Sequence, residues 1–83
     1  MTRDDIRAVV VRELGRVAPD ADPAALGPDD DVRDGLDLDS MDFLRFVQEL
    51  HAVLGVDVPE RDYRVIATIG SCADYLARRL GEA

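Results

Sequence analysis

Apolar residues recur at spacings of three and four along most of the chain, and this pattern predicts three amphipathic helices. The first helix should begin near residue 3, with Thr2 as its N-cap and Asp5 at the N3 position. Its apolar face consists of Ile6, Val9, Val10, Leu14 and Val17. Such a face must be buried against other elements, so this helix is expected to line a core.

The second predicted helix begins after Asp39, which suits the N-cap, and places Asp42 at N3. It should end before Gly55, because glycine readily adopts the left-handed conformation that follows a helix. Its apolar stripe consists of Phe43, Leu44, Phe46, Val47, Leu50, Val53 and Leu54. At about 100° per residue, Met41 points roughly 150° away from the centre of this stripe and is expected to be exposed.

The last helix should begin after the N-cap residue Thr68 and end at Gly81. Its buried face consists of Ile69, Cys72, Leu76 and Leu80. The preceding "VDVPE" is expected to be an extended connector, since no second strand exists to pair with it, and a short helical turn should cover residues 61–66. The long segment 18–39, rich in proline and glycine, should be a loop that Leu26, Val32, Leu36 and Leu38 anchor to the core.

These elements predict an all-α fold, a small three-to-four-helix bundle with a long loop between helices one and two. The 83 residues form one domain, since so short a chain buries only about 60–65% of the surface that it exposes when unfolded. The net charge is −8, and its distribution is uneven. Residues 20–39 hold eight aspartates and Arg33, a sum of −7, whereas the other 63 residues hold ten acidic residues and nine arginines, a sum of −1. Nucleic acid and anionic membranes should be repelled by this patch, and a basic protein surface is its natural complement.

The N-terminal stretch has charged residues where a signal peptide would need a continuous apolar segment, and no later run is long enough to span a membrane. We therefore expect a cytoplasmic protein. Cys72 is the one cysteine, which fits a reducing compartment, and it is expected to be a buried, inert thiol. His51 should be half-buried or exposed on the second helix, and no set of cysteine and histidine ligands for a metal can form.

Ser40 follows directly after the predicted N-cap of the second helix, and it has no base to activate it as a nucleophile. His51 is eleven residues further along the same helix, roughly 16 Å away at about 1.5 Å per residue, and the chain has no lysine. The sequence therefore argues against serine-hydrolase chemistry. A hydroxyl at a helix start is instead well placed to carry a phosphate, because the free N–H groups and the helix dipole favour an anion there.

The residues around this serine resemble the acyl carrier protein family. Residues 38–42, "LDSMD", match the family signature "L-D-S-L-D". The stretch at 54–60, "LGVDVPE", is similar to the end of the family's second helix and the connector that follows it. The stretch at 67–80, "ATIGSCADYLARRL", resembles the family's last helix. The resemblance extends over about the whole chain, from Thr2 to Leu80.

This resemblance implies that a phosphopantetheinyl transferase moves 4′-phosphopantetheine from coenzyme A to Ser40, and that acyl groups are then carried as thioesters on the thiol of the arm. It implies a monomeric carrier without enzymatic activity of its own, whose partners are acyl-loading, elongating or transferring enzymes with basic docking surfaces. It also implies that the second helix is the docking surface. The expected recognition residues are Leu38, Asp39, Met41, Asp42, Arg45 and Glu49.

Three positions differ from the family pattern. Asp37 stands where glycine is usual, Met41 replaces the usual leucine, and Arg45 lies on the outward face where fatty-acid carriers tend to have an acid. The charge reversal at Arg45 favours a freestanding carrier of a specialised pathway, such as polyketide or modified-lipid assembly, over a housekeeping fatty-acid carrier.

Three alternatives stay open at this point. A peptidyl or aminoacyl carrier fits "DLDS" less well than an acyl carrier does. A helical interaction module without a prosthetic group would use Ser40 only as the first residue of a helix. A calcium loop with Gly35 at position six would place Val32 third and Met41 twelfth, so that two required ligands are missing.

Overall fold

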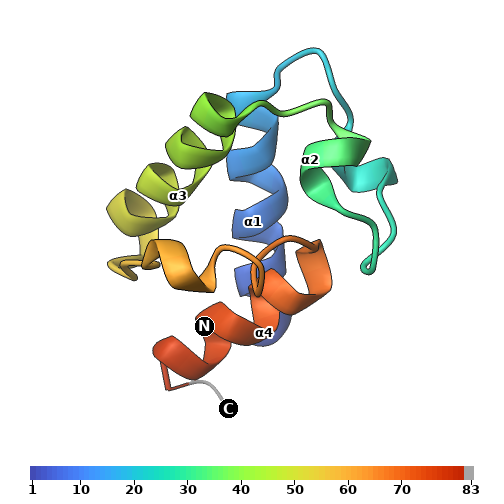
Figure 1. Cartoon of the computed structure of the whole chain (residues 1–83). Helices are drawn as coiled ribbons and strands as arrows, with labels where there is room; N and C mark the ends of the chain where they lie inside the picture. Colours follow the sequence, from blue (N-terminus) through green and yellow to red (C-terminus); the bar gives the residue numbers. More distant parts are fainter. Residues whose placement is uncertain (82–83) are drawn as a thin grey trace.

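The computed structural model describes residues 1–81, which form a helical bundle (Figure 1). The elements are α1 (Arg3–Val17), a 3₁₀ turn η1 (Pro23–Ala25), α2 (Val32–Gly35), α3 (Ser40–Leu54), a 3₁₀ turn η2 (Glu60–Asp62) and α4 (Ile69–Arg79). Helix α1 packs against both α3 and α4, and in Figure 1 it runs through the centre with α3 on one side and α2 on the other. The predicted all-α bundle is confirmed.

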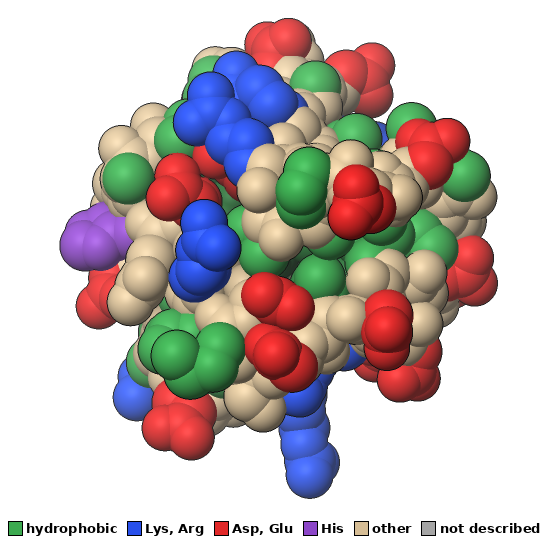
Figure 2. All heavy atoms as spheres, turned by 90° about the horizontal axis from the view of Figure 1, so that it is seen from above, with side chains coloured by type: hydrophobic (Ala, Val, Ile, Leu, Met, Phe, Trp, Pro, Cys, Tyr) green, Lys and Arg blue, Asp and Glu red, His purple; other side chains and the backbone are tan. Residues whose placement is uncertain are grey.

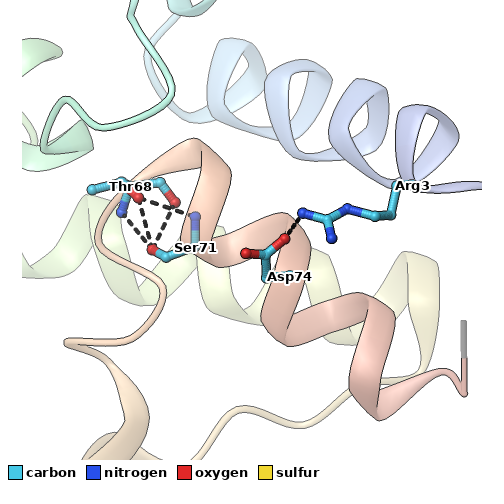
Figure 3. A network of polar contacts seen from close by, with 4 residues as sticks. All are labelled: Arg3, Thr68, Ser71 and Asp74. Carbon is cyan, nitrogen blue, oxygen red and sulfur yellow. Dashed lines mark hydrogen bonds and ion pairs between the residues drawn. The ribbon is translucent and has the colours of Figure 1, made fainter. Parts of the chain in front are cut away.

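Each long helix begins where the sequence predicts, because a side chain caps its first turn. The hydroxyl of Thr2 accepts from the N–H of Asp5, and the Asp5 carboxylate accepts from the N–H of Thr2, both at 3.1 Å. Thr68 and Ser71 form the same reciprocal pair at the start of α4, as Figure 3 shows. An ion pair from Arg3 to Asp74 joins α1 to α4 beside this cap (Figure 3).

The core lies between the three long helices and includes the whole predicted face of α1. On α3 the buried residues are Phe43, Phe46, Val47 and Leu50. The prediction was wrong for Leu44 and Val53, whose side chains are 38% and 41% exposed. The reason is that α3 packs along one side only, so its buried residues form a single narrow stripe and the two side chains lie outside it. Leu54 and Leu80, near the ends of their helices, are half-buried.

Glu13 is buried with no exposed surface, although the sequence pattern did not mark it. It lies on the core-facing side of α1, one turn after Val9 and Val10. One carboxylate oxygen accepts a hydrogen bond from Arg12 Nε at 2.8 Å and lies 3.7 Å from Arg16 Nε. The other oxygen is buried without a hydrogen-bond partner. A charged group therefore occupies a position that periodicity assigns to the core.

The segment between α1 and α3 contains two short elements that the sequence did not predict, η1 and α2. The carboxylate of Asp31 caps α2 by accepting from the N–H groups of Arg33 at 2.8 Å and Asp34 at 3.1 Å. A helix of four residues is too short to show periodicity, which explains the omission. The predicted anchors Val32, Leu36 and Leu38 are buried, and Leu26 is half-buried.

Two backbone hydrogen bonds fix this segment to the start of α4. Val32 N–H donates to the carbonyl of Ala67 at 2.8 Å, and Gly70 N–H donates to the carbonyl of Pro28 at 2.9 Å. A Cβ atom on Gly70 would lie 3.0 Å from that Pro28 oxygen, so glycine allows the close approach.

The connector after α3 is extended as predicted, with Val56 and Val58 buried. The helical turn expected over 61–66 is instead the 3₁₀ turn η2 at Glu60–Asp62, followed by non-helical turns. Among the helices of residues 1–81, none combines the length and the hydrophobicity that crossing a membrane requires.

Candidate functional site

Ser40 is the first residue of α3, and its side chain is exposed. The residues on either side of it form a reciprocal cap: Asp39 Oδ1 accepts from Asp42 N–H at 2.8 Å, and Asp42 Oδ2 accepts from Asp39 N–H at 3.3 Å. The predicted cap of α3 is confirmed. Both carboxylates are directed at backbone donors, so the hydroxyl of Ser40 is left accessible to a visiting enzyme.

The turn that leads into this serine depends on Asp37, whose φ of 55° lies in the left-handed region. This is the position where the sequence differs from the family's usual glycine. Aspartate tolerates the left-handed conformation better than most residues, because its short polar side chain can bond locally. The chain therefore keeps the backbone shape that glycine would give.

Arg33, on α2, reaches the serine from the other side of the turn. Its Nη2 donates to Ser40 Oγ at 3.2 Å, and its Cζ lies 5.6 Å from the centroid of the Phe43 ring. The sequence showed Arg33 as the one basic residue of the acidic segment, but it did not show this contact. The contact joins α2 to the first turn of α3, and the left-handed turn at Asp37 lies between these two helices in the chain.

Two hollows lie next to the start of α3. One, of about 330 Å³, is lined by the end of α1 and by residues that include Leu38 and Asp42. The other, of about 190 Å³, is lined by Asp31, Arg33, Phe43, Tyr63, Arg64 and Ala67. The rings of Phe43 and Tyr63 meet edge to face at 5.5 Å. The view in Figure 2, from above the long loop, shows acidic side chains spread around hydrophobic atoms at the bottom of a hollow.

The predicted recognition residues fall into three groups, which are exposed, half-buried and buried. Met41 is 69% exposed, as expected, and Asp39 and Arg45 are also exposed. Asp42 and Glu49 are half-buried, whereas Leu38 is 7% exposed and belongs to the core, so its side chain does not face a partner. Leu44, one turn after Met41, is also exposed and was not among the predicted recognition residues.

His51 and Cys72, which were not predicted as site residues, differ in exposure. His51 is exposed on α3. Burial raises the pKa of the Cys72 thiol to about 12, which keeps it protonated at neutral pH. In the part of the chain that the structure describes, no group of three or more histidine, cysteine, aspartate or glutamate residues is arranged to hold a metal ion.

Comparison with known proteins identifies the family. Residues 4–76 match the family model described as "Phosphopantetheine attachment site". An acyl carrier protein of Syntrophobacter fumaroxidans is 30% identical over 70 residues, covering 84% of this chain and 80% of that protein. The chain belongs to the acyl carrier protein family. An acyl carrier protein of Rubrobacter xylanophilus is 23% identical over 73 residues, covering 84% of this chain and 90% of the relative.

The fold agrees with this membership. A solved acyl carrier protein structure from Enterococcus faecalis superimposes with a TM-score of 0.71 at 22% sequence identity, and the match covers 100% of both chains. As an acyl carrier protein, the chain is a carrier and not an enzyme, it holds 4′-phosphopantetheine covalently, and it interacts with a phosphopantetheinyl transferase and with other partner enzymes. An exposed hydroxyl with a guanidinium 3.2 Å away suits the phosphodiester of this group.

Proposed function

We propose that Ser40 is the residue that carries 4′-phosphopantetheine, on a single carrier domain that spans residues 1–83. The observation that carries the proposal is the accessibility of its hydroxyl at the start of α3. Ser71, the other serine of the chain, is half-buried, and its hydroxyl is engaged with Thr68 at 2.7 Å. The two serines thus differ in how freely an enzyme could reach them.

Ser40 needs a base from a partner enzyme to lose its proton. His51 lies about 16 Å further along α3, by helix rise, and the chain has no lysine. In the loading step the Ser40 oxygen forms a bond to the β-phosphorus of coenzyme A, the pyrophosphate bond breaks, and the adenosine 3′,5′-bisphosphate leaves. The thiol of the attached arm then holds acyl groups as thioesters.

The decisive experiment compares the two serines. Purified protein is incubated with coenzyme A and a broad-specificity phosphopantetheinyl transferase, and the intact mass is measured. Wild type and Ser71→Ala should each gain the mass of one phosphopantetheine, and Ser40→Ala should gain none. Loading that survives Ser40→Ala would contradict the assignment, and the absence of loading in all three proteins would favour an interaction module without a prosthetic group.

We propose that partner enzymes dock on the exposed face of α3 next to Ser40. Met41 and Leu44 offer apolar contacts there, and Arg45 lies beside them among acidic residues. Partners with a basic surface would complement the acidic segment 20–39 and would pair an acid with Arg45. Met41→Ala should lower kcat/KM for loading, whereas Val53→Ala, exposed about 18 Å away along the same helix, should leave it unchanged.

The carrier would act as a monomer in the cytoplasm, in fatty-acid, polyketide or other specialised lipid assembly. The reversed charge at Arg45 supports a specialised pathway over housekeeping fatty-acid synthesis. Mixing the loaded carrier with purified loading enzymes and following thioester formation by intact mass would identify the acyl class.

A further inference from the structure

Arg33 occupies a fixed position beside Ser40. Its own N–H is held by Asp31 at 2.8 Å, its carbonyl accepts from the N–H of Leu38 at 2.9 Å, and the neighbouring Val32 is 1% exposed. The backbone on both sides of Arg33 is therefore tied to the fold. The guanidinium extends from this anchored position to the Ser40 oxygen and over the Phe43 ring.

Within residues 1–81, no carboxylate forms an ion pair with Arg33, although eight aspartates lie in residues 20–39. None of the ion pairs formed within residues 1–81 includes Arg33. The nearest acids have other tasks: Asp31, Asp39 and Asp42 each accept hydrogen bonds from backbone N–H groups at the starts of α2 and α3. A guanidinium in the most acidic part of the chain thus has a neutral hydroxyl and an aromatic ring as its partners.

We propose that Arg33 binds the phosphodiester of the prosthetic group and holds the base of the arm against α2. This inference rests on Ser40 as the attachment residue. The Ser40 oxygen becomes a bridging oxygen of the phosphodiester, so the non-bridging oxygens lie within two covalent bonds of an atom that Arg33 already contacts at 3.2 Å. A guanidinium binds phosphate oxygens through two parallel hydrogen bonds, and the start of α3 favours the same negative charge.

The position of Arg33 also sets the side from which the arm departs. Arg33 and Phe43 both line the hollow of about 190 Å³, which the Tyr63 ring and Arg64 complete. A phosphodiester held by Arg33 starts the arm at the edge of this hollow and away from the larger hollow that Leu38 and Asp42 line. Arg33 is thus a positioning residue for the arm.

The test compares unloaded and loaded forms of wild type, Arg33→Gln and Arg64→Gln. Arg64 is the matched control, because it lines the same hollow but makes no contact with Ser40. Loading adds a negative charge next to the acidic segment, and in wild type Arg33 would offset it. The fall in melting temperature on loading should therefore be larger in Arg33→Gln than in wild type, and the two falls should differ by about 4 °C or more. The ³¹P chemical shift of the phosphodiester should change in Arg33→Gln and stay at the wild-type value in Arg64→Gln.

A second readout needs loading of wild type only, in case Arg33→Gln is loaded poorly. The Nε–H signal of Arg33, assigned from its absence in unloaded Arg33→Gln, should shift on loading, and high salt should reduce that shift. Equal melting-temperature changes on loading in wild type and Arg33→Gln, together with an unmoved Arg33 signal, would overturn the proposal and leave Ser40 as attachment residue intact. An absence of loading in wild type would instead overturn both proposals.

Discussion

Asp39 combines two roles that a pair of substitutions can separate: it caps α3, and it carries a charge next to Ser40. Its carboxylate accepts from the N–H of Asp42 at 2.8 Å. Asp39→Ala removes both the acceptor and the charge, which costs about 0.5–2 kcal/mol for a typical N-cap. Asp39→Asn keeps an acceptor of similar capping strength and loses the favourable interaction of the charge with the helix dipole, worth about 0.3–1 kcal/mol.

Thermal unfolding followed by circular dichroism measures the structural role. For a domain of this size 1 kcal/mol corresponds to a shift of about 4–8 °C, so Asp39→Ala should lower the melting temperature by several degrees and Asp39→Asn by about half as much. Equal losses in the two variants would refute the cap as the source of stability, because asparagine retains the hydrogen bond.

The loading reaction measures the recognition role at a temperature where all variants are folded. If a basic transferase surface recognises the charge, Asp39→Asn should lower kcat/KM by roughly two- to fivefold at low salt, the effect of about 0.5–1 kcal/mol from an exposed ion pair. The decrease should shrink as salt is added. Loading of the Asp39→Asn variant at the wild-type rate would refute Asp39 as a recognition residue while leaving its capping role untouched.

Three further outcomes are expected. The unloaded native protein should show no fast-reacting thiol and the loaded protein one, because Cys72 is buried. Stability should fall as the pH rises from about 9 toward 12, where the unfolded thiol ionises and the folded one does not. Cys72→Ala should make this slope smaller without removing it, because burial and the hydrogen bond to Asp62 also raise the pKa of Tyr75. Leu50→Ala should lower the free energy of unfolding by about 2–5 kcal/mol in urea, whereas Leu44→Ala, at an exposed position, should lower it by less than about 1 kcal/mol. Similar losses of stability in the two variants would contradict the packing of α3. Glu13→Met should leave the melting temperature unchanged or raise it, because an apolar side chain of similar length takes the place of a buried carboxylate that has one unpaired oxygen. A loss of several degrees would show that the contacts of Glu13 with the arginines outweigh the cost of desolvating its carboxylate.

The long helices were predictable because each carries two independent signals in the sequence. A capping residue, Thr2, Asp39 or Thr68, marks each start, and an apolar stripe follows at helical spacing. The exposure of Met41 followed from the same geometry, since its angle to the stripe depends only on its position in the helix. Local rules were sufficient wherever the determining contacts lie within one element.

Features that depend on contacts between elements were not predictable in the same way. The stripe of α3 is narrower than its apolar residues suggest, because only one side of the helix meets α1. Glu13 is buried because of its position on α1, and a charged residue gives no sign of burial in a hydrophobic pattern. The contact between Arg33 and Ser40 spans seven residues and joins α2 to α3 across the left-handed turn at Asp37.

Part of the acidity of the long loop is explained by helix capping. Asp31 and Asp39 direct their charge at backbone N–H groups of helix starts, as Asp42 does within α3, so part of the negative patch of the loop serves folding. With these carboxylates engaged, Arg33 stays available to Ser40. The acidic surroundings of Ser40 therefore include one arginine whose charge is directed at the serine hydroxyl, which suits the anionic group that we propose to be attached there.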